Sequence, residues 1–186
     1  MDTLNDSDIR QPLIDKLNSL SPKPKAILEE LRVHNGNAIA DVVTLHRGAH
    51  CYEIKGDNDK VERVIKQAKY YDLAFRKLTL VTTRRHLKKA LSVTPEHWGI
   101  ILAEEVSGRI IFKYERSAQI NAGFDKRVAL LTLWKEEMLD MMSTHVGYKS
   151  KSRDVLAGLI SNTKKKEELS ESICSTLLSR YESSVA

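Results

Sequence analysis

Residues 40–55 read ADVVTLHRGAHCYEIK, and they are the most informative segment of the sequence. Two runs rich in strand-forming residues flank a short segment that ends in Gly48, which supplies the positive φ that three-residue hairpin loops favour. We therefore predict a β-hairpin with residues 46–48 as its loop. Counting back along both arms of this hairpin places Asp41 directly opposite Glu53.

Two carboxylates and one ammonium group converge in this arrangement. Asp41 and Glu53 would have Cβ atoms roughly 5 Å apart, and like charges this close destabilise a sheet unless a cation neutralises them. Lys55 shares a face with Glu53 because side chains alternate along a strand. Hard oxygen ligands of this kind suit Mg²⁺ or Mn²⁺. The sequence therefore predicts a metal site at Asp41 and Glu53, with Lys55 placed to orient or deprotonate an attacking water.

Asp41 followed by Glu53-Ile54-Lys55 resembles the D-(x)n-(D/E)-x-K signature of the PD-(D/E)XK nuclease superfamily. The resemblance implies a restriction-endonuclease-like fold and divalent-metal-dependent hydrolysis of phosphodiester bonds. DNA is the favoured substrate, and RNA is the alternative. Two positions depart from the pattern: Ala40 replaces the proline of the signature, and Ile39 stands where a basic residue is expected. For the triad alone, the alternative interpretation is an ordinary amphipathic hairpin with solvated charges.

A helix is predicted after the hairpin, because Asp59 has the chemistry of an N-cap and the apolar periodicity continues to about Phe75. On this helix Arg63, Gln67 and Tyr71 lie four residues apart and form a polar row. Gln67 and Tyr71 resemble the Q-x-x-x-Y element of the RecB-like and lambda-exonuclease-like branches of the superfamily. That resemblance implies that they support the site or contact nucleic acid. For Tyr71, a partly buried helix tyrosine is the alternative.

A further acidic residue commonly comes from the element before the aspartate in this superfamily. The chain offers Glu29 and Glu30 there, and Glu30 is the favoured candidate for a supporting catalytic acid. A longer set of residues also resembles a little-characterised bacterial group within the same superfamily, and this resemblance covers residues 8–115. The residues that carry it are Glu29-Glu30-Leu31, Gly36, Ala40-Asp41, Glu53-Ile54-Lys55, Asp57, Asp59, Arg63, Gln67 and Tyr71.

The distribution of charge is more informative than its total. The chain carries a net charge of +5, but residues 60–90 contain ten basic side chains and two acidic ones. A basic segment of this kind favours binding to a polyanion such as DNA. The alternative is that these side chains are the solvated faces of two helices. The candidates for nucleic-acid contacts are Arg63, Lys66, Lys69, Arg84 and Arg85.

The order of predicted elements is αβββαβ, which indicates an α/β fold with a mixed central sheet flanked by helices. The expected helices and strands are a helix at 7–20, strands at 26–33, 38–45 and 50–55, a helix at 59–75, a strand at 78–83, a basic helix at 84–91, and a strand near 100–103 paired with 108–114. From residue 125 the pattern is helical, with helices expected at 128–142, 152–161 and 165–180. We expect a nuclease-like domain over residues 1–124 and a helical C-terminal subdomain over residues 125–186.

Composition excludes several classes of protein. No apolar stretch approaches the roughly 18 residues that a membrane-spanning helix needs, and the N-terminus lacks the features of a signal peptide. We therefore expect a cytoplasmic protein without a membrane partner. Cys51 and Cys174 are far apart and have no C-x-x-C partner, so neither a zinc site nor a disulfide framework is indicated.

Three functions compete at this point. The leading prediction is a Mg²⁺- or Mn²⁺-dependent nuclease that acts on DNA. The second is a nucleic-acid-binding or regulatory module that keeps the nuclease fold without catalysis. The third is an interaction or immunity protein that binds a protein partner, or a second copy of itself, through the C-terminal helices.

Overall fold

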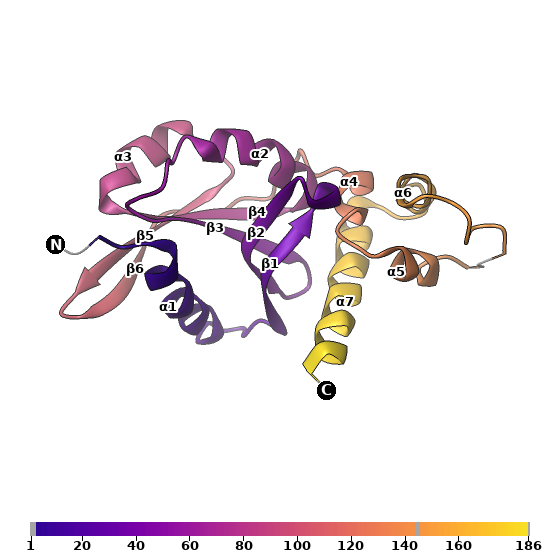
Figure 1. The fold of residues 1–186 in the computed structure, drawn as a ribbon, viewed down its shortest axis with the longest axis horizontal. Helices are drawn as coiled ribbons and strands as arrows, with labels where there is room; N and C mark the ends of the chain where they lie inside the picture. Colours follow the sequence, from indigo (N-terminus) through magenta and orange to yellow (C-terminus); the bar gives the residue numbers. More distant parts are fainter. Residues whose placement is uncertain (1–2, 144–145, 186) are drawn as a thin grey trace.

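The computed structural model describes residues 3–143 and 146–185 and contains a six-stranded mixed sheet with strands in sequence order (Figure 1). The sheet pairs are antiparallel from β1 to β3 and at β5–β6, and parallel from β3 to β5. This confirms the mixed sheet flanked by helices. The strands are β1 (Ala26–Val33), β2 (Ala38–Leu45), β3 (Ala49–Lys55), β4 (Lys77–Thr83), β5 (Gly99–Val106) and β6 (Arg109–Arg116).

The predicted hairpin is present in the predicted register. Leu45 pairs with Ala49, and the ladder between β2 and β3 continues to Val42 and Tyr52. It ends there, one residue before Asp41 would pair with Glu53. The register is as predicted, although Gly48 does not have the positive φ that the prediction gave it, and the two acidic residues are not a strand pair.

The helices lie on two faces of the sheet. α1 (Asp6–Asn18) covers one face, whereas α2 (Arg63–Ala74) and α3 (Arg84–Val93) lie together on the other (Figure 1). α2 connects β3 to β4 and α3 connects β4 to β5, each between neighbouring parallel strands. Successive right-handed crossovers in one direction place their helices on the same face. A short 3-10 turn, η1 (His34–Gly36), joins β1 to β2.

Two buried clusters fill the space between these layers. Under α1, a cluster that includes Ile9, Leu13 and Ile54 packs on one side of the sheet. Under α2, a larger cluster that includes Val64 and Tyr71 packs on the other side. Ile54 therefore faces α1, and its neighbours Glu53 and Lys55 face the α2 side, as strand alternation predicts.

The C-terminal segment is helical, but its first predicted helix is divided. In place of one helix over 128–142, the chain forms two short helices with a break at residues 131–134. Asp125 caps the first by accepting a hydrogen bond from the amide of Val128, and Glu137 accepts one from the amide of Trp134 at the start of the second. The helices are α4 (Lys126–Leu130), α5 (Lys135–Asp140), α6 (Arg153–Ser161) and α7 (Lys166–Val185).

The C-terminal helices share a core with the sheet. Leu130 and Leu169 belong to the same buried cluster as Val43 and Val64. The division of the chain at residue 124 stays a prediction. Among the described residues, no helix combines the length and the apolar character needed to cross a membrane.

Candidate functional site

Asp41 lies where β2 and β3 separate. Its Oδ2 accepts a hydrogen bond from the main-chain amide of Ile54 at 2.7 Å, so the carboxylate continues the connection between the strands after the ladder has ended. Its Oδ1 lies 3.5 Å from Nη2 of Arg10, which reaches it from α1. The Asp41 side chain is 18% exposed, so it is largely withdrawn from solvent.

The β1–β2 pair is irregular beside Asp41. The pairing keeps one register on both sides, but the pair that would join Glu30 to Asp41 is missing. Glu30 has a φ of 53°, in the left-handed region that non-glycine residues rarely adopt. Ala40 and Val43 both belong to the cluster under α2, although strict alternation would place residues three apart on opposite faces. At this irregularity the alternation of side chains along β2 is interrupted, and the Asp41 side chain lies between β2 and β3, where it contacts the Ile54 amide.

The environment raises the pKa of Asp41 to about 7. Burial is the largest cause, because it disfavours the charged carboxylate, and the negative charge of Glu53 acts in the same direction. The hydrogen bond from Ile54 and the charge of Lys55 oppose these effects. Asp41 therefore holds a proton far more readily than an exposed aspartate.

Glu53 and Lys55 form a closed pair. Glu53 is 1% exposed and Lys55 is 7% exposed. The Lys55 Nζ donates to Glu53 Oε1, and it also donates to the carbonyl of Ile54 at 3.1 Å. The other carboxylate oxygen, Glu53 Oε2, is buried and has no hydrogen-bond partner among the described residues. The charge of Glu53 is thus offset by its own neighbour on the strand.

Gln67 and Tyr71 connect α2 to β2. The Tyr71 hydroxyl donates to the carbonyl of Ile39 at 2.6 Å, and Gln67 Nε2 donates to the Tyr71 oxygen at 3.4 Å. Burial, followed by the charge of Glu53, raises the pKa of the Tyr71 hydroxyl. Tyr71 is 0% exposed, so its position fits a supporting contact to the strand that carries Asp41.

Arg10 is the residue that sequence reasoning missed. Its guanidinium donates to both carboxylate oxygens of Asp6 at 2.8 and 3.0 Å and to the main-chain oxygen of Asp41 at 3.1 Å. It also lies 3.9 Å from Glu29 and 3.6 Å from Glu30, both of which are exposed. The i,i+4 spacing of Asp6 and Arg10 was a local signal, but nothing local indicated that Arg10 reaches β2.

The donor set at this site is poor in open metal ligands. Within the part of the chain that the structure describes, no group of three or more His, Cys, Asp or Glu side chains is arranged to hold a metal ion. The Asp41 oxygens already contact Ile54 and Arg10, and Glu53 is paired with Lys55. The expected binding of Mg²⁺ or Mn²⁺ stays a prediction.

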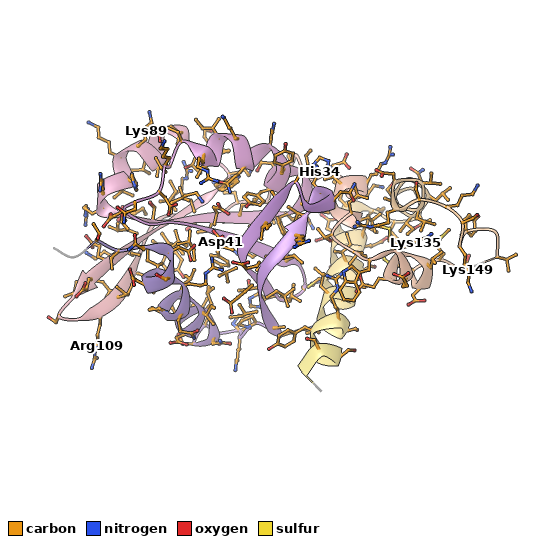
Figure 2. The ribbon with its side chains drawn as sticks, in the orientation of Figure 1. His34, Asp41, Lys89, Arg109, Lys135 and Lys149 are labelled. Atoms are coloured by element: carbon orange, nitrogen blue, oxygen red, sulfur yellow. The ribbon has the colours of Figure 1, made fainter. Side chains whose placement is uncertain are left out.

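The predicted basic residues lie on the outer faces of α2 and α3. Figure 2 shows Lys89 on the outer side of α3, well away from Lys135 and Lys149 near the C-terminal helices. Arg84 pairs with Glu104 at 2.6 Å, whereas the Lys69 Nζ lies 4.8 Å from the centre of the Tyr70 ring. We define the α2–α3 basic surface as seven exposed side chains that form no ion pair with the described residues: Lys60, Arg63, Lys66, Lys69, Arg85, Lys88 and Lys89.

A groove of about 1140 Å³ lies between β1 and the helices α5 and α7. Leu28 and Glu29 line it from the strand, and Trp134 and Arg180 line it from the helical side. The Arg180 guanidinium lies 4.2 Å from the centre of the Trp134 ring and donates to Glu137 at 2.7 Å. Glu29 and Glu30 line this groove and also lie near Arg10, so the groove adjoins the Asp41 site, whereas none of the seven side chains of the α2–α3 basic surface lines it.

These features define an α/β protein with a closed acid–lysine cluster inside its sheet and a basic helical face outside it. The chain belongs to the family described as bacteriophage P4 protein cII, whose model matches residues 1–185. Protein cII of Enterobacteria phage P4 is 23% identical over 143 residues, which are 76% of this chain and 54% of the phage protein. The chain therefore spans about half the length of that relative. No solved structure matches this chain.

This family membership corrects the leading prediction. The motif pattern predicted a Mg²⁺-dependent nuclease, a metal-binding hydrolase acting on phosphodiester bonds, whereas the family and the relative are both phage P4 protein cII. The assignment as an enzyme is wrong. The physical reason is visible in the site, because Lys55 offsets Glu53 and Arg10 lies beside Asp41. The sequence pattern predicted that a metal ion offsets these carboxylates, whereas in the structure Lys55 pairs with Glu53, and burial and Glu53 raise the pKa of Asp41 to about 7.

Proposed function

We propose that this chain is a non-catalytic nucleic-acid-binding module, built on a fold related to that of the PD-(D/E)XK nucleases, and that it binds DNA through the α2–α3 basic surface. The observation that carries the proposal is the set of seven exposed basic side chains without ion-pair partners among the described residues. Lys and Arg side chains held this way can neutralise phosphates and release counterions.

The acidic residues near this surface are mostly engaged elsewhere. Asp72 accepts hydrogen bonds from His97 at 2.8 Å and from Trp98 at 2.7 Å, and Glu104 pairs with Arg84 and Lys113. Glu62 is the exposed acidic residue next to α2. The positive charge of the surface is therefore opposed by little negative charge, which favours the approach of a polyanion.

The closed cluster at Asp41 supports the non-catalytic part of the proposal. Arg10 and Lys55 balance the carboxylates that a catalytic site would keep open, and Tyr71 is committed to the carbonyl of Ile39. In this interpretation the cluster connects β2 to β3 at the point where their ladder ends. Binding would then depend on the outer faces of α2 and α3, and it would persist in the presence of a chelator.

A second candidate function is protein binding at the groove between β1, α5 and α7. Its volume and the half-exposed Trp134 favour this candidate. The two candidates place the partner on different parts of the molecule, so substitutions on α2 and in the groove separate them.

The test is fluorescence anisotropy with labelled DNA at low salt, in a chelator, for the wild type and a triple charge reversal on α2. Arg63→Glu/Lys66→Glu/Lys69→Glu should weaken binding by at least tenfold, because three favourable phosphate contacts become repulsive. The matched control is Lys16→Glu/Lys23→Glu/Lys25→Glu, which reverses three exposed lysines on α1 and between α1 and β1. This control should bind like the wild type.

Two results would overturn the proposal. One is a folded wild-type protein that does not bind DNA even at low salt. The other is equal binding by the wild type and the α2 variant. Circular dichroism melts of all the proteins serve as the control that distinguishes loss of binding from loss of folding.

A further inference from the structure

The α2–α3 basic surface differs from a single-strand binding surface in its lack of accessible aromatic rings. Proteins that bind single strands without sequence preference combine basic grooves with aromatic side chains on which bases stack. Among the described residues, the exposed aromatic side chains are Tyr114, Trp134 and Tyr181. Tyr114 lies on β6, Trp134 directly precedes α5, and Tyr181 lies on α7, so none belongs to α2 or α3.

The aromatic residues that α2 does carry are covered. Tyr71 is fully buried, and Tyr70 is partly buried. The Lys69 Nζ lies 4.8 Å from the centre of the Tyr70 ring, and His34 packs against the same ring with centroids 5.3 Å apart. A base could stack on Tyr70 only after these neighbours had moved.

The groups that the surface does offer are ammonium and guanidinium groups on two adjacent helices. Arg63, Lys66 and Lys69 follow one another at intervals of three residues, which corresponds to about 4.5 Å along the axis of α2. Arg85, Lys88 and Lys89 present a second group on α3. Two groups on neighbouring helices can contact phosphates on a rigid, densely charged polymer, and a DNA duplex carries one charge per 1.7 Å or so of its axis.

We infer that the α2–α3 basic surface binds the phosphate backbone of duplex DNA without reading its sequence, and that it prefers a duplex to the corresponding single strand. This inference rests on the proposed function and specifies its ligand. The preference arises because phosphate contacts contribute affinity with a duplex, whereas a single strand would gain little from stacking on this surface.

The experiment compares two duplexes of unrelated sequence with their separate strands, by anisotropy over a range of salt concentrations. The two duplexes should bind with dissociation constants within about threefold of each other, and the single strands should bind at least about fivefold more weakly. If about five of the seven side chains contact phosphates, the duplex slope of log K against log salt should be about −4.5.

Two variants give the inference a second readout. Arg85→Glu/Lys88→Glu/Lys89→Glu should reduce the duplex slope by roughly 0.9 for each of these three side chains that contacts a phosphate, and so by about 2.7 if all three do. Tyr114→Ser removes an exposed aromatic ring outside the surface and should leave binding to both forms of DNA unchanged. Thermal melts of both variants serve as the control for folding.

The outcomes separate the inference from the proposed function. Single strands that bind as tightly as duplexes, or one duplex that binds more than about tenfold tighter than the other, would overturn the inference and leave a nucleic-acid-binding protein. A loss of single-strand binding in Tyr114→Ser would also overturn it. No binding to any DNA by the folded wild type would overturn the proposed function itself.

Discussion

The carboxylate of Asp41 accepts a hydrogen bond from the main-chain amide of Ile54 at the point where β2 and β3 separate. A side chain of β2 therefore replaces the backbone hydrogen bond that the strand pair lacks there. An isolated strand end would leave this amide without a partner, and a buried unpaired amide costs free energy. The same carboxylate is largely buried and close to Glu53, which raises its pKa to about 7. This one contact therefore links the shape of the sheet to the pH dependence of stability.

We expect Asp41 to destabilise the fold as the pH rises. Its pKa in the folded protein lies above its unfolded value, so its contribution is fully present below about pH 4 and is lost as the pH rises to 7. Asp41→Asn keeps an oxygen for the Ile54 amide and does not titrate. The free energy of unfolding of the variant minus that of the wild type, measured in urea, should therefore increase by roughly 2–4 kcal/mol between pH 4 and pH 8. Parallel stability curves for the two proteins would contradict the assignment.

His50 should act in the opposite direction. Burial and then the charge of Lys77 lower its pKa to about 3, and its ring stacks on Tyr52 and hydrogen-bonds to Thr79. A lowered pKa means that its contribution is present above about pH 6.5 and is lost as the pH falls towards 3. Between about pH 6.5 and pH 3, His50→Gln should lose about 1–3 kcal/mol less of its free energy of unfolding than the wild type loses. The prediction fails if acid unfolding of the variant and the wild type share one midpoint and one slope.

The buried pair of Glu53 and Lys55 should show strong coupling. Glu53→Gln leaves the Lys55 ammonium buried without its counter-charge, which should cost about 3–5 kcal/mol of the free energy of unfolding. Glu53→Gln/Lys55→Met removes both charges and should recover most of that loss. Chemical unfolding of the two single variants and the double variant gives the coupling energy. Additive effects would show that the pair does not act as a unit.

The hydroxyl of Tyr71 should stabilise the connection between α2 and β2. Tyr71→Phe keeps the buried ring but leaves the carbonyl of Ile39 without this donor, so it should cost about 1–3 kcal/mol. Tyr70→Phe is the matched control, because no hydrogen bond joins the Tyr70 hydroxyl to another described residue. Hydrogen exchange at the amides of residues 38–42 should increase in Tyr71→Phe alone, and equal exchange in both variants would refute this role.

The family comparison shows why the sequence motif led to the wrong function. Asp41, Glu53 and Lys55 match the nuclease signature in spacing, but a fold and a short motif can serve many activities. Membership in the phage P4 protein cII family outweighs three residues with a variable gap between them. In the structure the motif residues lie where β2 and β3 separate, and the motif did not establish the chemistry there.

Residues that depend on short-range rules were predicted well. The position of the short loop at residues 46–48 gave the hairpin register, although Gly48 lacks the predicted positive φ. The apolar run after Lys77 became β4. Both features depend on loop length and periodicity, which act over a few residues. The helix expected over 128–142 was divided, since the caps at Asp125 and Glu137 begin two short helices where periodicity alone indicated one.

The amino-acid sequence was sufficient to predict the order of the elements, the hairpin register and the basic character of the segment that forms α2 and α3. Three features became evident only in the folded protein: Arg10 lies beside Asp41, Lys55 pairs with Glu53, and both basic helices lie on one face of the sheet. The reason is that periodicity and turn chemistry depend on neighbours along the chain. The burial and pairing of charges depend on contacts between distant segments, such as the one that joins residues 10 and 41.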